Sequence, residues 1–480
     1  MQTHNKNQFQ ENLNFVLMLG LLLFAPWVAS GKSIYALLVL ELAALALLAS
    51  LFWNPFIPKR LPMIVWLSLG LLASIPLLYL ISFSSPLWQE LPHPDHYQAA
   101  VTWLQQQDSE YKAWLAPSIV PQKTLHALLA LLPLLAIFIA ASSTPVRKLT
   151  GAIYALLILA SIQAIWGILQ YTMGLEQLYV WGSKHSGGNA RATYLNRDHY
   201  VALMYLVLPL SIGLFSLNIG KYTQIKESDN KTKFDRWLIK TLLLALATFL
   251  LLIAALFSRS RTGIFLMILA IFMSALLFAR HVGGKRSAGL TTTVTMLAFG
   301  MASSVGLIPV VNRFIAINPM EDFRWEMAAT AIVGIKAFFP LGSGPGTFQE
   351  IYRTVQPYDQ RHFINHAHND YLELLFEIGA VGILVLALLL ILYIYGWFSL
   401  RGMRWHEIRF IKVGAGISLF LMMLHSLVDF NMHTPANALI VAFLTGVFLA
   451  KIPEDELQRS HRRRRRRHSK SHSQKAEEPL

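Results

Sequence analysis

The chain has 480 residues, of which 55% are hydrophobic and only 14% are charged, and it contains no cysteine. A soluble domain carries about 25% charged residues, so this composition excludes an ordinary soluble protein, and the lack of cysteine excludes disulfides, thiol catalysis and cysteine-bound zinc. The formal net charge of +15 includes a run of arginines at 462–467, which in a membrane protein is typical of a cytoplasmic tail near anionic lipid, so we expect no nucleic-acid partner.

Apolar stretches that are long enough to cross a bilayer as helices recur along the whole chain. We interpret the first as a retained span and not as a removed signal peptide. The fold prediction is an all-α polytopic membrane protein, with one membrane domain over residues 1–451 and a disordered basic tail over 452–480. We predict about twelve transmembrane helices, at 14–30, 33–53, 62–83, 124–142, 149–170, 198–218, 237–258, 262–279, 291–311, 374–396, 410–430 and 435–451.

The loops between these spans differ in charge on alternate sides. Those on one side are short and basic, with Lys59, Arg147, Lys226, Arg280 and Arg404 among their residues. The positive-inside rule makes this side cytoplasmic and places both termini inside. The predicted periplasmic side has longer segments, and in the last of them the apolar spacing of Phe323–Phe339 predicts a helix along the membrane surface. These periplasmic segments are 84–123, 171–197 and 312–373.

Arginine recurs on the predicted external side, where positive charge is normally rare. Arg259 and Arg261 lie in a tight turn between two spans, and Arg324 lies at the start of the predicted surface helix. The planar guanidinium fork suits bidentate contact with phosphate, so this surface is a candidate phosphate site. The alternative for arginines at span ends is that they snorkel to lipid headgroups.

Two further arginines, Arg191 and Arg197, lie in the polar segment just before the predicted span 198–218. A flexible, glycine-bearing segment with arginine can form part of a phosphate cradle. The alternative is an ordinary helix start that is capped by Asn196 or Asp198. The spacing alone favours neither.

The most informative polar run is 366–372, where a long polar segment meets an apolar one. Asp370 and Glu373 have the spacing of a capping box that opens the next span. His368 then precedes a helix N-terminus, where a neutral imidazole can act as a general base beside an anion. His366 and His368 could instead ligate a metal, but no third ligand follows at close spacing, so we predict no metal. The remaining alternative is a histidine bonded to a loop carbonyl.

A second polar group ends the predicted span 410–430. His425 and Asp429 are four residues apart and are expected to share a helix face. A carboxylate inside a membrane span is a candidate functional group. It can orient a catalytic group or pair with an arginine, and we favour a structural role.

In these segments the chain resembles the O-antigen ligase and polymerase superfamily, whose members use undecaprenyl-diphosphate-linked glycans at the outer face of the bacterial inner membrane. The resemblance implies a functional histidine at His368 and functional arginines at Arg191 and Arg261. Tyr194 stands where the family often has glycine, which makes Arg197 the alternative to Arg191. The matching pieces, in family order, are Arg191–Asn196, Ser260–Gly263, Phe339–Phe348, His368–Glu373 and His425–Asp429.

The resemblance also implies a GT-C-like fold and a metal-independent, inverting glycosyl transfer without a cofactor. His368 would act on the acceptor hydroxyl, and Arg191 or Arg197 would hold the donor diphosphate together with Arg259 and Arg261. The expected partners are the lipid-linked glycan donor, membrane lipids and a sugar acceptor, which is either lipid A-core or a lipid-linked repeat; a chain-length regulator is a candidate partner. The supporting residues would be His366, Asn369, Asp370, Arg324 and Asp429.

Other functions compete with this interpretation. Within the same enzyme class, a protein O-oligosaccharyltransferase would use serine or threonine as the acceptor, and the sequence does not decide among acceptors. From another class, a transporter or flippase for lipid-linked glycan would also have many spans. Transporters often consist of two similar halves with polar groups near the midplane. Here the polar groups gather at one predicted surface and the halves differ, which favours the enzyme.

Overall fold

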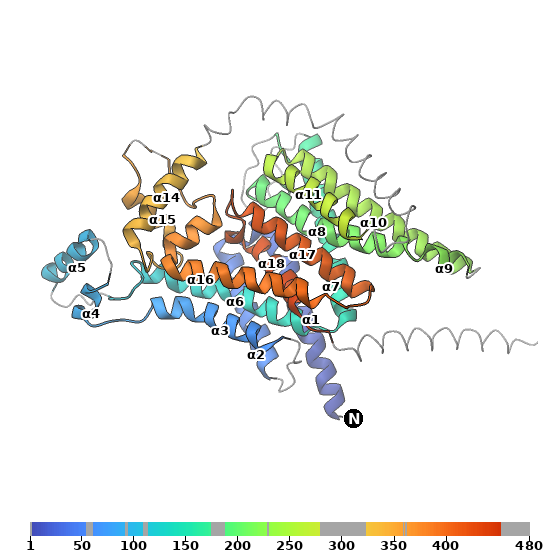
Figure 1. Ribbon diagram of the computed structural model, residues 1–480, viewed down its shortest axis with the longest axis horizontal. Coiled ribbons are helices and arrows are strands. Elements are labelled where there is room, and N and C mark those ends of the chain that lie inside the picture. Colours follow the sequence, from blue (N-terminus) through green and yellow to red (C-terminus); the bar gives the residue numbers. More distant parts are fainter. Residues whose placement is uncertain are drawn as a thin grey trace, which may run out of the picture.

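The computed structural model describes residues 2–53, 61–91, 95–108, 114–173, 188–227, 230–278, 323–358, 360 and 362–452, and within these ranges the protein is helical and has no strand. Long helices lie side by side in a bundle (Figure 1). They are α1 (Gln2–Trp27), α2 (Ile34–Trp53), α3 (Met63–Tyr79), α6 (Pro121–Ser143), α7 (Val146–Thr172), α8 (Arg197–Ile219), α10 (Lys231–Phe257), α11 (Arg261–Phe278), α16 (Asp370–Ser399), α17 (Glu407–His425) and α18 (Pro435–Leu449).

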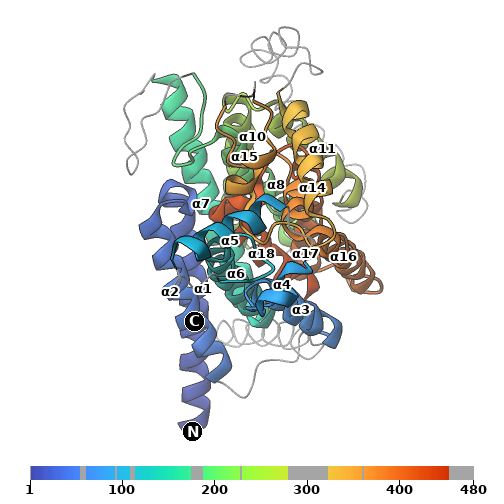
Figure 2. The same ribbon diagram turned by 90° about the vertical axis from the view of Figure 1, so that its left-hand side faces the viewer.

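Short elements connect the long helices. Four of them, α4, α5, α14 and α15, lie at one end of the bundle, whereas α9 lies at the other end (Figure 1). Figure 2 looks onto the first end, with these four helices in front of the bundle. The short elements are η1 (Ala29–Gly31), α4 (Ser85–Gln89), α5 (Asp95–Gln107), α9 (Tyr222–Lys226), α14 (Arg324–Phe338), α15 (Phe348–Val355) and η5 (Asn431–His433).

The helices confirm a polytopic membrane protein. Nine of the described helices are long and apolar enough to cross a membrane, and α3 and α18 are apolar but shorter. Each predicted span has a helical counterpart except 291–311, which lies outside the described residues. Several predicted limits were wrong. The first helix already begins at Gln2, and α10 begins at Lys231 and not at 237. The predicted span 410–430 ends as a helix at His425, because a polar turn follows it.

The centre of the bundle is α8, which is buried over almost its whole length and packs against α7, α10, α11 and α17. A helix that is apolar on all sides is expected in such a central position. The predicted surface helix exists as α14. It packs on α16 and α15, with Phe338 and Phe348 both against the ring of Phe376. These contacts attach the helices at the end of the bundle to the membrane helix that follows residues 366–369.

Gly263 allows α11 to approach α8 closely. A Cβ atom added at Gly263 would lie 2.2 Å from Cγ1 of Val201, a stiff β-branched residue of α8. We therefore expect Gly263→Ala to destabilise the protein by about 1–3 kcal/mol through overpacking. Thermal unfolding in detergent measures this effect. Gly151→Ala is the control, because nothing lies within 4 Å of the added atom. Equal unfolding temperatures for the two variants would contradict the packing.

Candidate active site

Turns that are far apart in the sequence meet at one end of the bundle. The backbone N–H of Asp370 donates to the carbonyl of Ser426 at 2.9 Å, and that of Ala190 donates to Phe257 at 2.8 Å. The turn between α1 and α2 packs against the start of α18 at the same end, because a Cβ atom added at Gly31 would lie 2.9 Å from Cβ of Pro435. The turns that meet are 28–33, 188–196, 258–260, 366–369 and 426–434.

His368 and Asp429 form the pair at the centre of this end. Nδ1 of His368 lies 3.1 Å from Oδ1 of Asp429; the histidine side chain is 26% exposed and the carboxylate is only 1% exposed. A buried carboxylate that accepts from Nδ1–H leaves Nε2 as the basic nitrogen of the ring. In this arrangement the partly exposed ring of His368 has the orientation that a general base would need.

Asp429 is held in its charged form. Burial raises its pKa, but the hydrogen bond from His368 and the charges of His199 and His425 outweigh burial, so the pKa lies below its ordinary value. Nε2 of His199 and Nε2 of His425 lie 3.7 Å and 3.8 Å from Oδ2 of Asp429. Three histidines thus surround the carboxylate of Asp429. The expected shared helix face of His425 and Asp429 was wrong, because α17 ends at His425 and Asp429 lies in the turn that follows.

Backbone strain marks the same segments. His368, Arg259 and Ala192 have φ values of +50°, +55° and +49°. Residues other than glycine rarely adopt this left-handed conformation, which costs about 1–3 kcal/mol each and is concentrated at functional sites. All three residues lie in segments that the sequence had singled out. The surrounding contacts hold them in conformations that an unconstrained turn would not adopt.

The ring of Phe430 is the surface on which the histidines are arranged. His366 stacks on it with the ring centroids 4.4 Å apart, and His368 and His199 each meet it edge-on at 4.7 Å. The ammonium of Lys32 lies 4.9 Å from the same ring centroid. Sequence reasoning missed Lys32, His199 and Phe430. Their only signal was their position beside predicted span ends.

The expected capping box was wrong. Asn369, and not Asp370, caps α16, because its side chain accepts from the N–H groups of Tyr371 and Leu372 at 3.0 Å each. Its amide nitrogen also donates to the carbonyl of Leu427 at 2.9 Å. Because the Asn369 amide caps the helix, the carboxylates of Asp370 and Glu373 can accept hydrogen bonds from other donors. Asn369 thus joins the start of α16 to the turn after α17.

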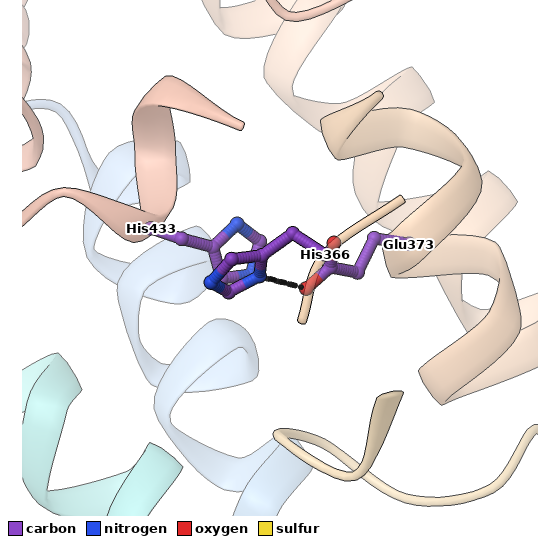
Figure 3. A group of neighbouring side chains, drawn as sticks. All are labelled: His366, Glu373 and His433. Atoms are coloured by element: carbon purple, nitrogen blue, oxygen red, sulfur yellow. Dashed lines mark hydrogen bonds and ion pairs between the residues drawn. The ribbon is translucent and has the colours of Figure 1, made fainter. Parts of the chain in front are cut away.

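The carboxylates of Asp370 and Glu373 bind histidines instead, and Figure 3 shows His366 and His433 beside Glu373. Oε1 of Glu373 lies 2.8 Å from Nδ1 of His366 and 3.2 Å from Nε2 of His433. Nδ1 of His433 lies 3.0 Å from Oδ1 of Asp370. Burial lowers the pKa of His433, but the charge of Glu373 and the hydrogen bond and charge of Asp370 raise it to about 10.

The two histidines that could have shared a metal ion lie in different groups of side chains. His366 and His368 do not face one site, because His368 contacts Asp429 and His366 contacts Glu373. A third ligand nevertheless exists, since ligand atoms of His366, Glu373 and His433 all lie within 4.8 Å of one another. Sequence spacing could not reveal it, because His433 comes from a distant turn. These three residues could hold a metal ion.

The arginines of the prediction lie at the same end of the bundle. Nη2 of Arg259 lies 3.0 Å from the hydroxyl of Tyr171, and Nη1 of Arg191 donates to the carbonyl of Leu195 at 3.1 Å. Burial lowers the pKa of Arg191. Arg197 and Arg261 are the first residues of α8 and α11, which pack against each other. Two adjacent helix N-termini that begin with arginine form a positive surface suited to an anion.

Two contacts link the arginine segments to the histidine pair. His199, two residues after Arg197, lies against Asp429, and its Nδ1 is 2.8 Å from Oγ1 of Thr434. Arg324, the first residue of α14, acts electrostatically on His425. A negatively charged group near the starts of α8 and α11 would therefore lie on the same end of the protein as His368.

Residues 246–387 match the family model described as O-Antigen ligase, and this range includes Arg259, Arg261 and His368. No curated protein matches the chain significantly. Over residues 246–387 this multi-pass membrane protein is therefore similar to the O-antigen ligase family, which supports the resemblance to the O-antigen ligase and polymerase superfamily.

Proposed function

We propose that this protein transfers glycan from an undecaprenyl-diphosphate-linked donor to a sugar hydroxyl, at the periplasmic face of the bacterial inner membrane. The observation that carries the proposal is the His368–Asp429 pair, which lies at the same end of an apolar bundle as the arginine-bearing helix starts. The family implies a lipid-linked glycan donor and an acceptor in general. In this proposal the basic loops at the other end face the cytoplasm.

The transfer is a single displacement. Nε2 of His368 takes the proton of the acceptor hydroxyl, and the oxygen attacks the anomeric carbon as its bond to the diphosphate oxygen breaks. Asp429 stabilises the imidazolium that forms. Undecaprenyl diphosphate leaves with the bonding electrons, and Arg261 and Arg259, with Arg191 or Arg197, stabilise its charge. One attack at the anomeric carbon inverts its configuration. Because guanidinium groups supply the positive charge, the step needs no metal.

Lys32 is proposed to contribute to donor binding. Burial lowers the pKa of Lys32, whereas the charges of Asp429, Glu373 and Asp370 raise it. Lys32→Met keeps an unbranched apolar side chain beside Phe430 but removes the charge of the ammonium. The site then becomes more negative, so we expect kcat/KM for the donor to fall by roughly tenfold or more, as the loss of one charge-assisted contact would cause. Steady-state kinetics at varied donor concentration measure this.

Lys123→Met is the matched control for Lys32→Met. Lys123 lies at the same end of the bundle but pairs with Glu350 at 2.6 Å, and its side chain is 40% exposed. This variant should keep the donor kcat/KM of the wild type. If Lys32→Met behaved like Lys123→Met, Lys32 would be assigned to packing alone.

Identification of the product tests the proposed function. Purified protein in detergent micelles is given a synthetic undecaprenyl-diphosphate glycan and, separately, a lipid-linked repeat, lipid A-core or a serine-rich protein. Mass spectrometry then identifies the acceptor that gains mass. We expect glycan on a sugar acceptor. Glycan on the protein alone would overturn the sugar acceptor, and no product with any acceptor would overturn the transferase, because a transporter makes no covalent product in micelles.

A further inference from the structure

Three potential metal ligands converge beside the His368–Asp429 pair without belonging to it. His366 lies before α16, Glu373 lies in the first turn of α16, and His433 ends η5, so two segments that are far apart in the sequence supply the group (Figure 3). The carboxylate is 2% exposed, whereas His366 and His433 are 21% and 34% exposed. The group is therefore anchored in the protein and open to solvent on its histidine side.

The geometry is close to that of a bound metal. Two ligands that are each about 2.1 Å from a tetrahedral metal lie about 3.4 Å apart. Nε2 of His433 is 3.2 Å from Oε1 of Glu373, and Nδ1 of His366 is 2.8 Å from the same oxygen. Nδ1 of His366 and Nε2 of His433 lie within 4.8 Å of each other, so the three atoms surround a space that an ion could occupy after adjustment of the side chains. Solvent can occupy the remaining position, since both imidazoles are partly exposed.

A second layer of contacts orients the ligands. A metal-binding histidine usually donates its other ring N–H to a carboxylate, which fixes the ring and its tautomer. Nδ1 of His433 lies 3.0 Å from Asp370, so its Nε2 is turned toward Glu373. The other oxygen of Glu373 accepts from the N–H of Ala367 at 2.8 Å. Ser426 donates to Asp370 at 2.7 Å. Each of these partners holds a ligand in place.

The local charge also favours a cation. The carboxylate of Glu373 is itself one of the three groups, and the carboxylate of Asp370 lies 3.0 Å from Nδ1 of His433. Two imidazoles and one carboxylate form a ligand set that suits zinc and its neighbours among the divalent transition metals. We propose that His366, Glu373 and His433 bind one divalent transition-metal ion, of which zinc is the best fit, and that this ion fastens the turn before α16 to η5.

The proposed ion is structural and takes no part in the transfer step. It would sit behind the ring of Phe430, on which both His366 and His368 pack. It would thereby hold the turn in which His368 keeps its left-handed backbone. The proposal is independent of the transferase function, because metal binding and unfolding temperature are measured without any glycan.

Metal content and thermal unfolding test this proposal. Protein stripped with a chelator is dialysed against Zn²⁺ or, for its visible absorption bands, Co²⁺. We expect about one ion per chain, cobalt bands typical of nitrogen and oxygen ligands, and a higher unfolding temperature than in the stripped protein. His433→Gln and Glu373→Gln should lose the ion. Asp370→Asn should bind about 10–100-fold more weakly, because it orients His433.

Two matched variants separate this site from other histidines. His362→Gln alters an exposed histidine of the same segment, whose ring meets Phe323 edge-on, and this variant should keep the ion. His368→Ala should also keep the ion while it loses transfer. Glu373 is buried, so its variant could fail to fold. The side chain of His433 is a third exposed, so His433→Gln is the decisive variant once size-exclusion chromatography shows that it elutes as the wild type does. Equal metal content in His433→Gln and the wild type, or no ion in either, would overturn the proposal.

Discussion

Replacing His368 with alanine is expected to lower the rate of glycan transfer by about 10²–10⁴-fold, the usual contribution of a general base. Donor affinity should change little, because the arginines hold the diphosphate independently of the imidazole. His366→Ala should have a milder effect on transfer, since His366 contacts Glu373 and not Asp429. Initial rates with a synthetic donor, together with equilibrium binding of a labelled donor, separate the two effects.

A substitution of Asp429, the partner of His368, tests the same prediction. Asp429→Asn keeps the size of the side chain but removes the charge that fixes the ring and stabilises the imidazolium. We expect a loss of at least about 10²-fold in the transfer rate, again with donor binding preserved. Exposed His362 is the control position, and His362→Ala should transfer normally. Normal transfer by His368→Ala would make His368 a structural residue.

The second large effect is expected at Arg261, which begins α11 at the turn that contains Arg259. Arg261→Lys keeps the positive charge but loses the planar fork, so it cannot contact two phosphate oxygens in the same way. We expect kcat/KM to fall by roughly 10²-fold, with a larger loss in Arg261→Ala, while the protein still folds. Kinetics at varied donor concentration measure the loss.

Arg353→Lys is the matched control for Arg261→Lys. Arg353 lies in α15, and its guanidinium is 4.4 Å from the ring centroid of Phe363. We therefore assign Arg353 a role in packing. Its replacement should leave kcat/KM unchanged. Near-normal turnover of Arg261→Ala would remove Arg261 from the donor site. Arg191→Ala and Arg197→Ala, tested in parallel, show which of these two arginines contacts the diphosphate.

Much of the helical architecture was predictable because lipid-facing helices impose long apolar runs. The ends of the helices were less predictable where polar residues continue a helix or interrupt an apolar run. Helix α1 extends through the polar residues before Asn14, and α17 stops at His425 although the run Leu427–Phe430 is mostly apolar. A polar turn inside the bundle is stabilised by contacts with other turns, and a hydropathy pattern contains no information about those contacts.

The candidate site was predictable only in part for the same reason. His368, Arg261 and Asp429 belong to local motifs, and the sequence singled them out. Lys32 did not belong to such a motif, although it lies over Phe430. His433 ends the polar group that begins at His425, but nothing in that spacing indicated its contact with Glu373. Side chains that meet through tertiary folding carry no spacing signal. The assignment of Asp370 as a cap failed because a nearby asparagine satisfied the helix N-terminus, so the carboxylate bound His433 instead.

The stoichiometry of lipid-diphosphate release tests the central claim most directly. Purified protein in micelles is mixed with donor and acceptor, and released undecaprenyl diphosphate and transferred glycan are quantified over the same time course. The proposed displacement predicts that one lipid diphosphate is released for each glycan transferred, and that both are lost in His368→Ala. Glycan transfer without release, or equal release by the wild type and His368→Ala, would contradict a displacement that depends on His368.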